Sequence, residues 1–296
     1  MDGVFFELPV GLSQQGNIYK NVELLRTNGV AEKVFLKKLA EKPFTWQGNV
    51  VSIAVKSIGP FEIGSECRQN YLKDNSVTIP QIVRNLTLAD INTLMVEIHR
   101  RCWVSFIPKQ EVICKYCGKR LVADIDLDKI DYFPETKEQM EQFSDIGYSS
   151  IEVNLKDGFI PPVIPKITDQ EKYQGITEQC YNRFVFRPPL LQDAIKHEAY
   201  FSDTIGFWRR IAIDCLTAIQ KVDENGFVVD TLPIEFHTYY GLKMFNEYLT
   251  GIDLRSIRTE LTEHLPTLPY AYYEPCGCED QKDIPMIMEA SSFFSE

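Results

Sequence analysis

The segment CKYCGKR, residues 114–120, holds two cysteines that are separated by two residues and followed by a glycine. A C-x-x-C turn directs two sulfurs at one centre, and Gly118 lets the backbone bend past a metal ion. A second pair, Cys276 and Cys278, lies in YEPCGCEDQ, residues 273–281. Together the pairs supply the four thiolates of a closed zinc site. We therefore predict one zinc ion per chain, bound by Cys114, Cys117, Cys276 and Cys278.

The two cysteine pairs are far apart in the sequence, so a shared ion would tie the C-terminal tail to the middle of the chain. The entropic cost of closing a long loop grows only logarithmically with its length. Structural zinc binds small peptides with an apparent free energy of about 10–16 kcal/mol, which exceeds that cost. Four thiolates leave no open coordination position, so the predicted ion is structural. The alternatives are two unrelated pairs of reduced thiols, or a redox pair at Cys114 and Cys117.

The composition restricts the classes of function. The 296 residues are 44% hydrophobic and 25% charged, with a net charge of -11, which disfavours a broad nucleic-acid surface. No apolar run approaches the length of a membrane span, and no secretory signal is visible in residues 1–11, so we expect none. We expect folding in a cytosol, where the eight cysteines are thiols or metal ligands rather than disulfides.

The first 133 residues are expected to form a β-rich domain that contains one strong helix. That helix covers residues 87–102, with Thr87 as its N-cap and apolar residues on one face. Residues 111–127 then predict a hairpin whose turn holds Cys114 and Cys117. The N-terminal part of an α+β fold is therefore expected to carry the zinc hairpin.

Residues 134–275 are expected to form a mainly helical second domain, followed by a C-terminal clasp tail at 276–296. The strongest helical pattern is residues 203–222, with Ile205, Trp208 and Ile211 among the side chains expected to face inward. No internal repeat is recognisable. The sequence also lacks the G-x-S-x-G, P-loop and G-x-G-x-x-G motifs, and its four histidines are scattered, so we predict a protein that is not an enzyme.

Three parts of the sequence resemble tail-assembly and baseplate-hub proteins of contractile-tailed bacteriophages and related injection systems. The matching stretches are ELPVGL with GNIYKNVELLRTNGVAEKVFL (7–12 and 16–36), VRNLTLADINTLMVEIHRRCW with ICKYCGKRLVADIDLDKI (83–103 and 113–130), and RFVFRPPLLQDAI (183–195). The resemblance implies a structural or assembly component of a contractile tail, whose partners are other tail, hub or baseplate proteins. It also implies the cytoplasm of the bacterial host or producer during assembly, or the assembled virion or particle, as its location.

A second interpretation stays open from the sequence. A zinc ribbon can serve as a platform for nucleic acid, or can belong to a zinc-dependent enzyme. Lys115, Tyr116, Lys119 and Arg120 would form the basic and aromatic core of such a platform. A third interpretation is an α+β scaffold that binds no metal.

Overall fold

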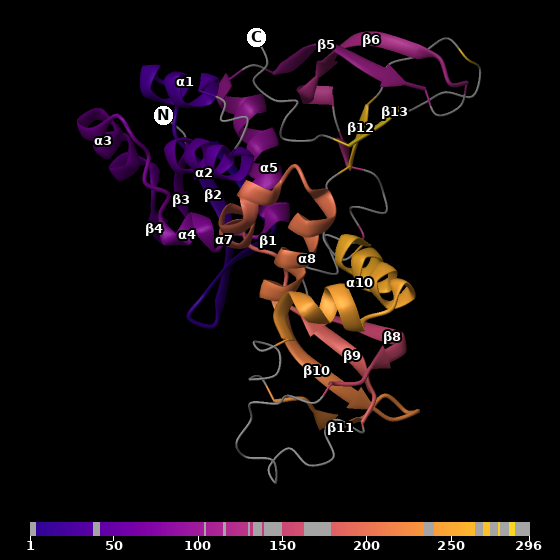
Figure 1. Ribbon diagram of the computed structural model, residues 1–296. Coiled ribbons are helices and arrows are strands. Elements are labelled where there is room, and N and C mark those ends of the chain that lie inside the picture. The colour runs from indigo at the N-terminus through magenta and orange to yellow at the C-terminus, as the bar shows by residue number, and fades with distance from the viewer. Residues whose placement is uncertain are drawn as a thin grey trace. The chain divides into compact units, whose positions relative to one another are not determined.

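In the computed structural model the chain forms two compact units (Figure 1). The structure describes residues 4–37, 42–103, 105–114, 117–129, 131–132, 150–162, 179–233, 240–263, 269–272 and 284–287, together with residues 138 and 278. Unit 1 comprises Met1–Tyr148, Leu190–Ala199 and Pro266–Glu296, and unit 2 comprises Ser149–Pro189 and Tyr200–Leu265. Helices and antiparallel sheets occur together and the N-terminal part is rich in strands, so the α+β prediction is confirmed. None of the described helices is long and apolar enough to cross a membrane.

Unit 1 is built on a four-stranded antiparallel sheet covered by helices. The sheet has the order β1-β2-β3-β4, with β1 at Val4–Gln14, β2 at Asn17–Leu24, β3 at Val55–Ile58 and β4 at Phe61–Glu62. The helices of its N-terminal segment include α1 (Gly29–Leu36), α2 (Pro43–Ala54), α3 (Gly64–Asp74), α4 (Gln81–Arg84) and α5 (Leu88–Ile98), followed by the short π-helix η1 (His99–Trp103). Helix α5 begins where predicted, because the Thr87 hydroxyl accepts a hydrogen bond from the Asp90 amide. The buried faces of α2 and α5 meet in the core of this unit.

Two smaller sheets complete unit 1. The predicted cysteine hairpin is present as β5 (Phe106–Ile113) and β6 (Arg120–Asp126), and the 3₁₀ turn η2 (Leu127–Lys129) follows it. The third sheet has the order β13-β12-β7 and joins β7 (Asp131–Tyr132) to the C-terminal strands β12 (Pro269–Tyr272) and β13 (Ile284–Ile287). The tail is thus paired through its backbone with the middle of the chain.

Unit 2 contains a second four-stranded antiparallel sheet, which lies within the residues that the sequence predicts to be mainly helical. The sheet consists of β8 (Ile151–Phe159), β9 (Tyr181–Phe186), β10 (Leu216–Val222) and β11 (Val228–Thr231). The helices described in this part of the sequence include α7 (Leu191–His197), the 3₁₀ turn η4 (Glu198–Tyr200), α8 (Thr204–Cys215), the short π-helix η5 (Met244–Tyr248) and α10 (Gly251–Glu263). By position, α7 belongs to unit 1, although it lies in sequence between β9 and α8.

The helix predicted for residues 203–222 is wrong in its second half. Helix α8 ends at Cys215, and Leu216–Val222 instead pairs with β9 as strand β10. The predicted inward face is also wrong at its start, because Ile205 is 60% exposed whereas Ile211 is buried. A short apolar run rich in β-branched residues satisfies both periods, so periodicity did not separate helix from strand here.

The two units repeat one topology, which the sequence did not reveal. Along the sequence, each copy has two antiparallel strands, then two helices, then a third and a fourth strand, and the sheet orders are β1-β2-β3-β4 and β8-β9-β10-β11. The first helix of the second copy, α7, belongs by position to unit 1. Helices α2 and α8 both have 12 residues, and each runs directly into the third strand of its sheet. In both units the last helix of the repeat, α5 or α10, packs against the first strand.

The irregularities of the two sheets also match. The β1–β2 pairing shifts between Glu7 and Leu12 and resumes at Leu12↔Tyr19. The β8–β9 pairing shifts between Asn154 and Phe159 and resumes at Phe159↔Tyr181. The third strands pair as Leu24↔Val55 and Phe186↔Leu216, each followed by a further register shift. Because bulges are specific features of a fold, shared bulges are stronger support for a repeat than equal strand numbers.

A buried aspartate fastens the first strand of unit 1 to its last helix. The Asp90 carboxylate is 0% exposed and accepts hydrogen bonds from the backbone amides of Val10 (3.0 Å) and Gly11 (3.1 Å) at the bulge of β1. It also accepts a hydrogen bond of 2.7 Å from the Thr87 hydroxyl. Burial raises the pKa of Asp90, and these hydrogen bonds oppose that shift.

Unit 2 contains the same arrangement at Asp253. This carboxylate is 0% exposed and accepts hydrogen bonds from the amides of Lys156 (2.7 Å) and Asp157 (3.2 Å) at the bulge of β8. The Thr250 hydroxyl donates to it at 3.1 Å. We call Asp90 and Asp253, each with its threonine, the aspartate anchors. The sequence Leu-Thr-x-x-Asp therefore occurs twice, at residues 86–90 and 249–253, in matching places.

Candidate metal centre

Three of the four predicted ligands lie together in unit 1. The sulfurs of Cys114, Cys117 and Cys278 are all within 4.8 Å of one another, and no other group of metal-binding side chains of this size occurs among the described residues. The Sγ atoms of Cys114 and Cys278 are 3.8 Å apart. Four sulfurs placed about 2.3 Å from one zinc ion at tetrahedral angles would be about 3.8 Å from each other. The spacing therefore suits two thiolates that share an ion, and it is far longer than a disulfide bond.

The hairpin turn supplies the first two thiols. Cys114 directly follows strand β5, and its backbone amide donates to the Lys119 carbonyl at 3.0 Å. The Gly118 amide donates back to the Cys114 carbonyl at 2.8 Å, and Gly118 has a φ angle of +71°. Residues other than glycine rarely adopt this backbone conformation, so a glycine at this position allows the turn to close. The closed turn places Cys114 in the interior and leaves Cys117 exposed.

The C-terminal tail supplies the third thiol. Cys278 lies between strands β12 and β13, and β12 pairs with β7 through Tyr270↔Tyr132 and Ala271↔Asp131. Strand β7 follows the cysteine hairpin closely in the sequence. Backbone pairing therefore brings the tail to the hairpin independently of any metal. Cys276, the predicted fourth ligand, lies outside the described residues.

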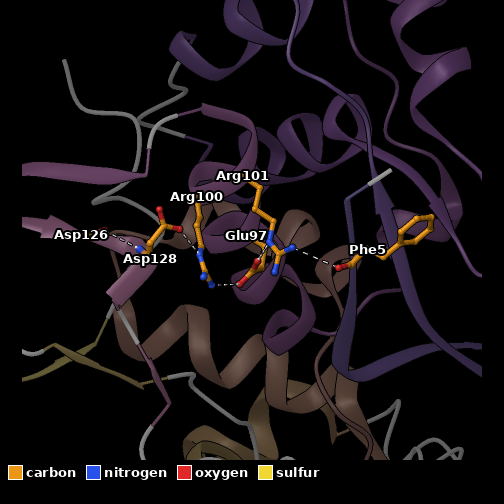
Figure 2. A network of polar contacts seen from close by, with 6 residues as sticks. All are labelled: Phe5, Glu97, Arg100, Arg101, Asp126 and Asp128. Atoms are coloured by element: carbon orange, nitrogen blue, oxygen red, sulfur yellow. Dashed lines mark hydrogen bonds and ion pairs between the residues drawn. The ribbon is translucent and has the colours of Figure 1, made fainter. Parts of the chain in front are cut away.

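A polar network connects the end of the hairpin to the core of unit 1, as Figure 2 shows. Arg100 forms ion pairs with Glu97 (3.6 Å) and with Asp128 (3.0 Å), which lies in the turn after β6. Arg101 binds the same Glu97 and donates to the Phe5 carbonyl of β1 at 3.5 Å. The hairpin that carries the cysteines is thus attached to both α5 and the first strand.

The remaining described cysteines have surroundings unlike those of the cluster. Burial raises the pKa of the Cys67 thiol to about 11 and that of the Cys102 thiol to about 11, so both are protonated at neutral pH. Cys215 is buried in unit 2 and Cys180 is exposed. Neither Cys67 nor Cys102 belongs to the group of three cysteines that could hold a metal.

The basic residues of the alternative interpretation are only partly described. Lys119 and Arg120 are exposed beside Cys117, and Lys115 and Tyr116 lie outside the described residues.

The sequence predicted that Cys114, Cys117 and Cys278 lie together, but neither aspartate anchor was predicted from it. The feature of the sequence that could have indicated the two anchors is the repeated Leu-Thr-x-x-Asp pattern.

Comparison of the chain with protein-family models, with curated proteins and with solved structures found no match.

Proposed function

We propose that this chain is a non-enzymatic structural or assembly component of the baseplate or hub of a contractile tail or related injection machine, stabilised by a structural zinc ion. Cys114, Cys117, Cys276 and Cys278 would hold the ion. The observation that carries the metal proposal is the approach of Cys278 to Cys114, because it joins two distant parts of the sequence at the distance expected for shared zinc ligands. The resemblance in three segments of the sequence supports the assignment to a tail.

A thiolate-bound zinc suits a protein of this kind. An assembly component must present a fixed surface to its partners, and disulfides do not persist in a reducing cytosol. Four thiolates fix the geometry of the hairpin and of the tail at the same time. When bound, the ion supplies structural crosslinking and no open coordination position for a substrate.

Metal analysis tests the zinc site. The full chain, purified without added metal, should contain about one zinc ion per molecule when measured by inductively coupled plasma mass spectrometry. Cys276→Ser and Cys278→Ser should lose most of the zinc. Cys180→Ser is the matched control, because Cys180 is exposed and lies outside the cluster. A chain without zinc, or one that keeps all of it in both tail variants, would contradict the site.

Association with neighbouring proteins tests the tail assignment separately. The full chain would be co-expressed with hub and tube subunits of a contractile tail and analysed by size-exclusion chromatography. We expect it to co-elute with at least one of them. If it elutes alone at every stage of assembly, the tail assignment is wrong, whereas the zinc site would still stand on its metal content.

A nucleic-acid platform is the second candidate, and exposed Lys119 and Arg120 beside Cys117 favour it. The net charge of -11 opposes it. Binding to DNA and RNA oligonucleotides would be measured against salt concentration. Binding that weakens steeply with salt would support this candidate, and no binding at low salt would remove it.

A further inference from the structure

Unit 2 has a groove between the first turns of α8 and α10. It has a volume of about 290 Å³, and the apolar residues that line it include Ile205, Trp208 and Leu254. Three arginines also line it, namely Arg209, Arg255 and Arg258. Ile205 and the neighbouring Ile252 are 60% and 51% exposed, so apolar surface remains accessible at this place.

The corresponding groove of unit 1 is filled by the chain itself. The segment Leu190–Ala199, which contains α7, crosses from the start of α5 to the start of α2. The Leu191 amide donates to the Leu86 carbonyl at 2.9 Å, and the Leu191 side chain lies over Gly48 of α2. At the other end of the segment, the Glu198 carboxylate accepts a hydrogen bond from the Thr45 amide (3.0 Å) in the first turn of α2.

The repeat gives each residue of the open groove a counterpart in unit 1. Aligning α2 with α8 and α5 with α10 through their matching sheets and aspartate anchors pairs Gly48 with Arg209, Asn92 with Arg255 and Met95 with Arg258. The filled groove is thus neutral at the three positions where the open groove carries arginine. A segment that fits the open groove must therefore differ in charge from the segment that fills unit 1.

The charges of the open groove favour an acidic occupant. Arg209 donates to the side-chain amide oxygen of Asn246 at 2.7 Å, and within the described residues no carboxylate forms an ion pair with Arg209 or Arg255. The first turns of α8 and α10 add the positive ends of two helix dipoles. Tryptophan and arginine both line this groove. These residue types are among those that contribute most to the binding energy of protein interfaces.

We propose that this groove is a docking site for an acidic, amphipathic helical segment of a partner protein. The segment would lie in the groove as Leu190–Ala199 lies in unit 1. One large apolar side chain would pack on Trp208 and Leu254, and carboxylates would face Arg209 and Arg255. A helix in a groove with a few apolar anchors is a common mode of peptide recognition. This proposal stands on the repeat and on the groove, independently of the zinc site and of the tail assignment.

Helix-locked peptides test the docking site on the full chain. The acidic probe is a fluorescent, stapled peptide of residues 190–199 that carries the changes Lys196→Glu and His197→Glu. The basic probe is the same segment with Asp193→Lys and Glu198→Lys. Fluorescence anisotropy should show binding of the acidic probe and at least about tenfold weaker binding of the basic probe.

Variants of the full chain locate the binding. Arg255→Glu should weaken binding of the acidic probe about tenfold or more. Lys156→Glu makes the same charge change at an exposed position of β8 in the same unit and should leave binding unchanged. Circular dichroism checks that both variants fold. No binding of the acidic probe, equal binding of both probes, or equal effects of the two variants would overturn the proposal. Self-association of the chain that Arg255→Glu abolishes would make a second copy the occupant and would also overturn it.

Discussion

Units 1 and 2 share the order of their strands, the bulges of their sheets and an aspartate anchor, yet they differ in what is added to this repeat. Unit 1 carries the cysteine hairpin, the paired C-terminal tail and a groove filled by residues 190–199. Unit 2 carries an open groove lined by arginines. The shared parts are those that close each sheet against its last helix. The parts that differ include the three cysteines that could hold a metal and the groove that we propose as a docking site, so the comparison separates the shared framework from the proposed functional features.

The largest difference between the units should appear when the metal is removed. We expect a chelator, or Cys278→Ser, to deprotect the backbone amides of β12 and β7 in unit 1. The amides of β8–β11 in unit 2 should keep their protection, because a structural zinc ion, at about 10–16 kcal/mol of apparent binding free energy, would stabilise unit 1 alone. Hydrogen-exchange mass spectrometry of the full chain measures both units at once. Equal deprotection of the two units would show that the ion does not act locally.

The aspartate anchors should behave alike in the two units. Asp90→Ala and Asp253→Ala each remove the acceptor of two backbone amides at a bulge, at up to about 1–3 kcal/mol for each amide left unsatisfied. We expect each variant to lower the free energy of unfolding by about 2–5 kcal/mol in urea titrations. Asp→Asn at the same positions keeps one acceptor oxygen and should lower it less. A large loss for one aspartate and none for the other would break the equivalence of the units.

Substitution of the glycine at each bulge also tests whether the two units are equivalent. Gly11 and Gly158 have φ angles of +94° and +78°, in a region that other residues rarely adopt. A Cβ atom on Gly11 would lie 2.9 Å from the Ile18 side chain, and one on Gly158 would collide with the Cys180 sulfur. We expect Gly11→Ala and Gly158→Ala each to cost about 1–3 kcal/mol, measured by urea unfolding. Gly16→Ala is the control for strain alone, because nothing lies within 4 Å of that position.

The smallest expected effect concerns the network of Figure 2. Arg100→Ala removes ion pairs to Glu97 and Asp128, and the Asp128 side chain is 61% exposed. Exposed ion pairs contribute about 0–1 kcal/mol, so we expect a loss within that range. Zinc content should stay near one ion per chain, since backbone pairing of β12 with β7 also positions the tail. A variant that loses its zinc would show that this network, rather than the strand pairing, positions the hairpin.

Local signals in the sequence predicted the local structure. Thr87 and the apolar face after it located α5, and the C-x-x-C-Gly turn located the β5–β6 hairpin. The hydrophobic pattern predicted the wrong element where pairing between distant strands decides the structure. Leu216–Val222 forms a strand because β9 and β11 lie on its two sides, and the sequence of the segment does not contain that information.

The repeat and the groove could not be predicted from the sequence for a related reason. The two copies share few residues, and the most visible ones are Leu-Thr-x-x-Asp and a bulge glycine. Their equivalence lies in backbone pairing, which fixes registers without fixing side chains. Ile205 and Trp208 resemble core residues of a helix, but the groove that leaves Ile205 exposed arises only when α8 and α10 are placed together.

X-ray absorption spectroscopy at the zinc edge tests the central claim most directly. On the full chain purified without added metal, we predict one zinc ion surrounded by four sulfurs at about 2.3 Å, and only three in Cys276→Ser that retains metal. A shell that contains nitrogen or oxygen ligands at about 2.0–2.1 Å in the unaltered chain, or a chain without zinc, would contradict the four-thiolate centre that joins the tail to the hairpin.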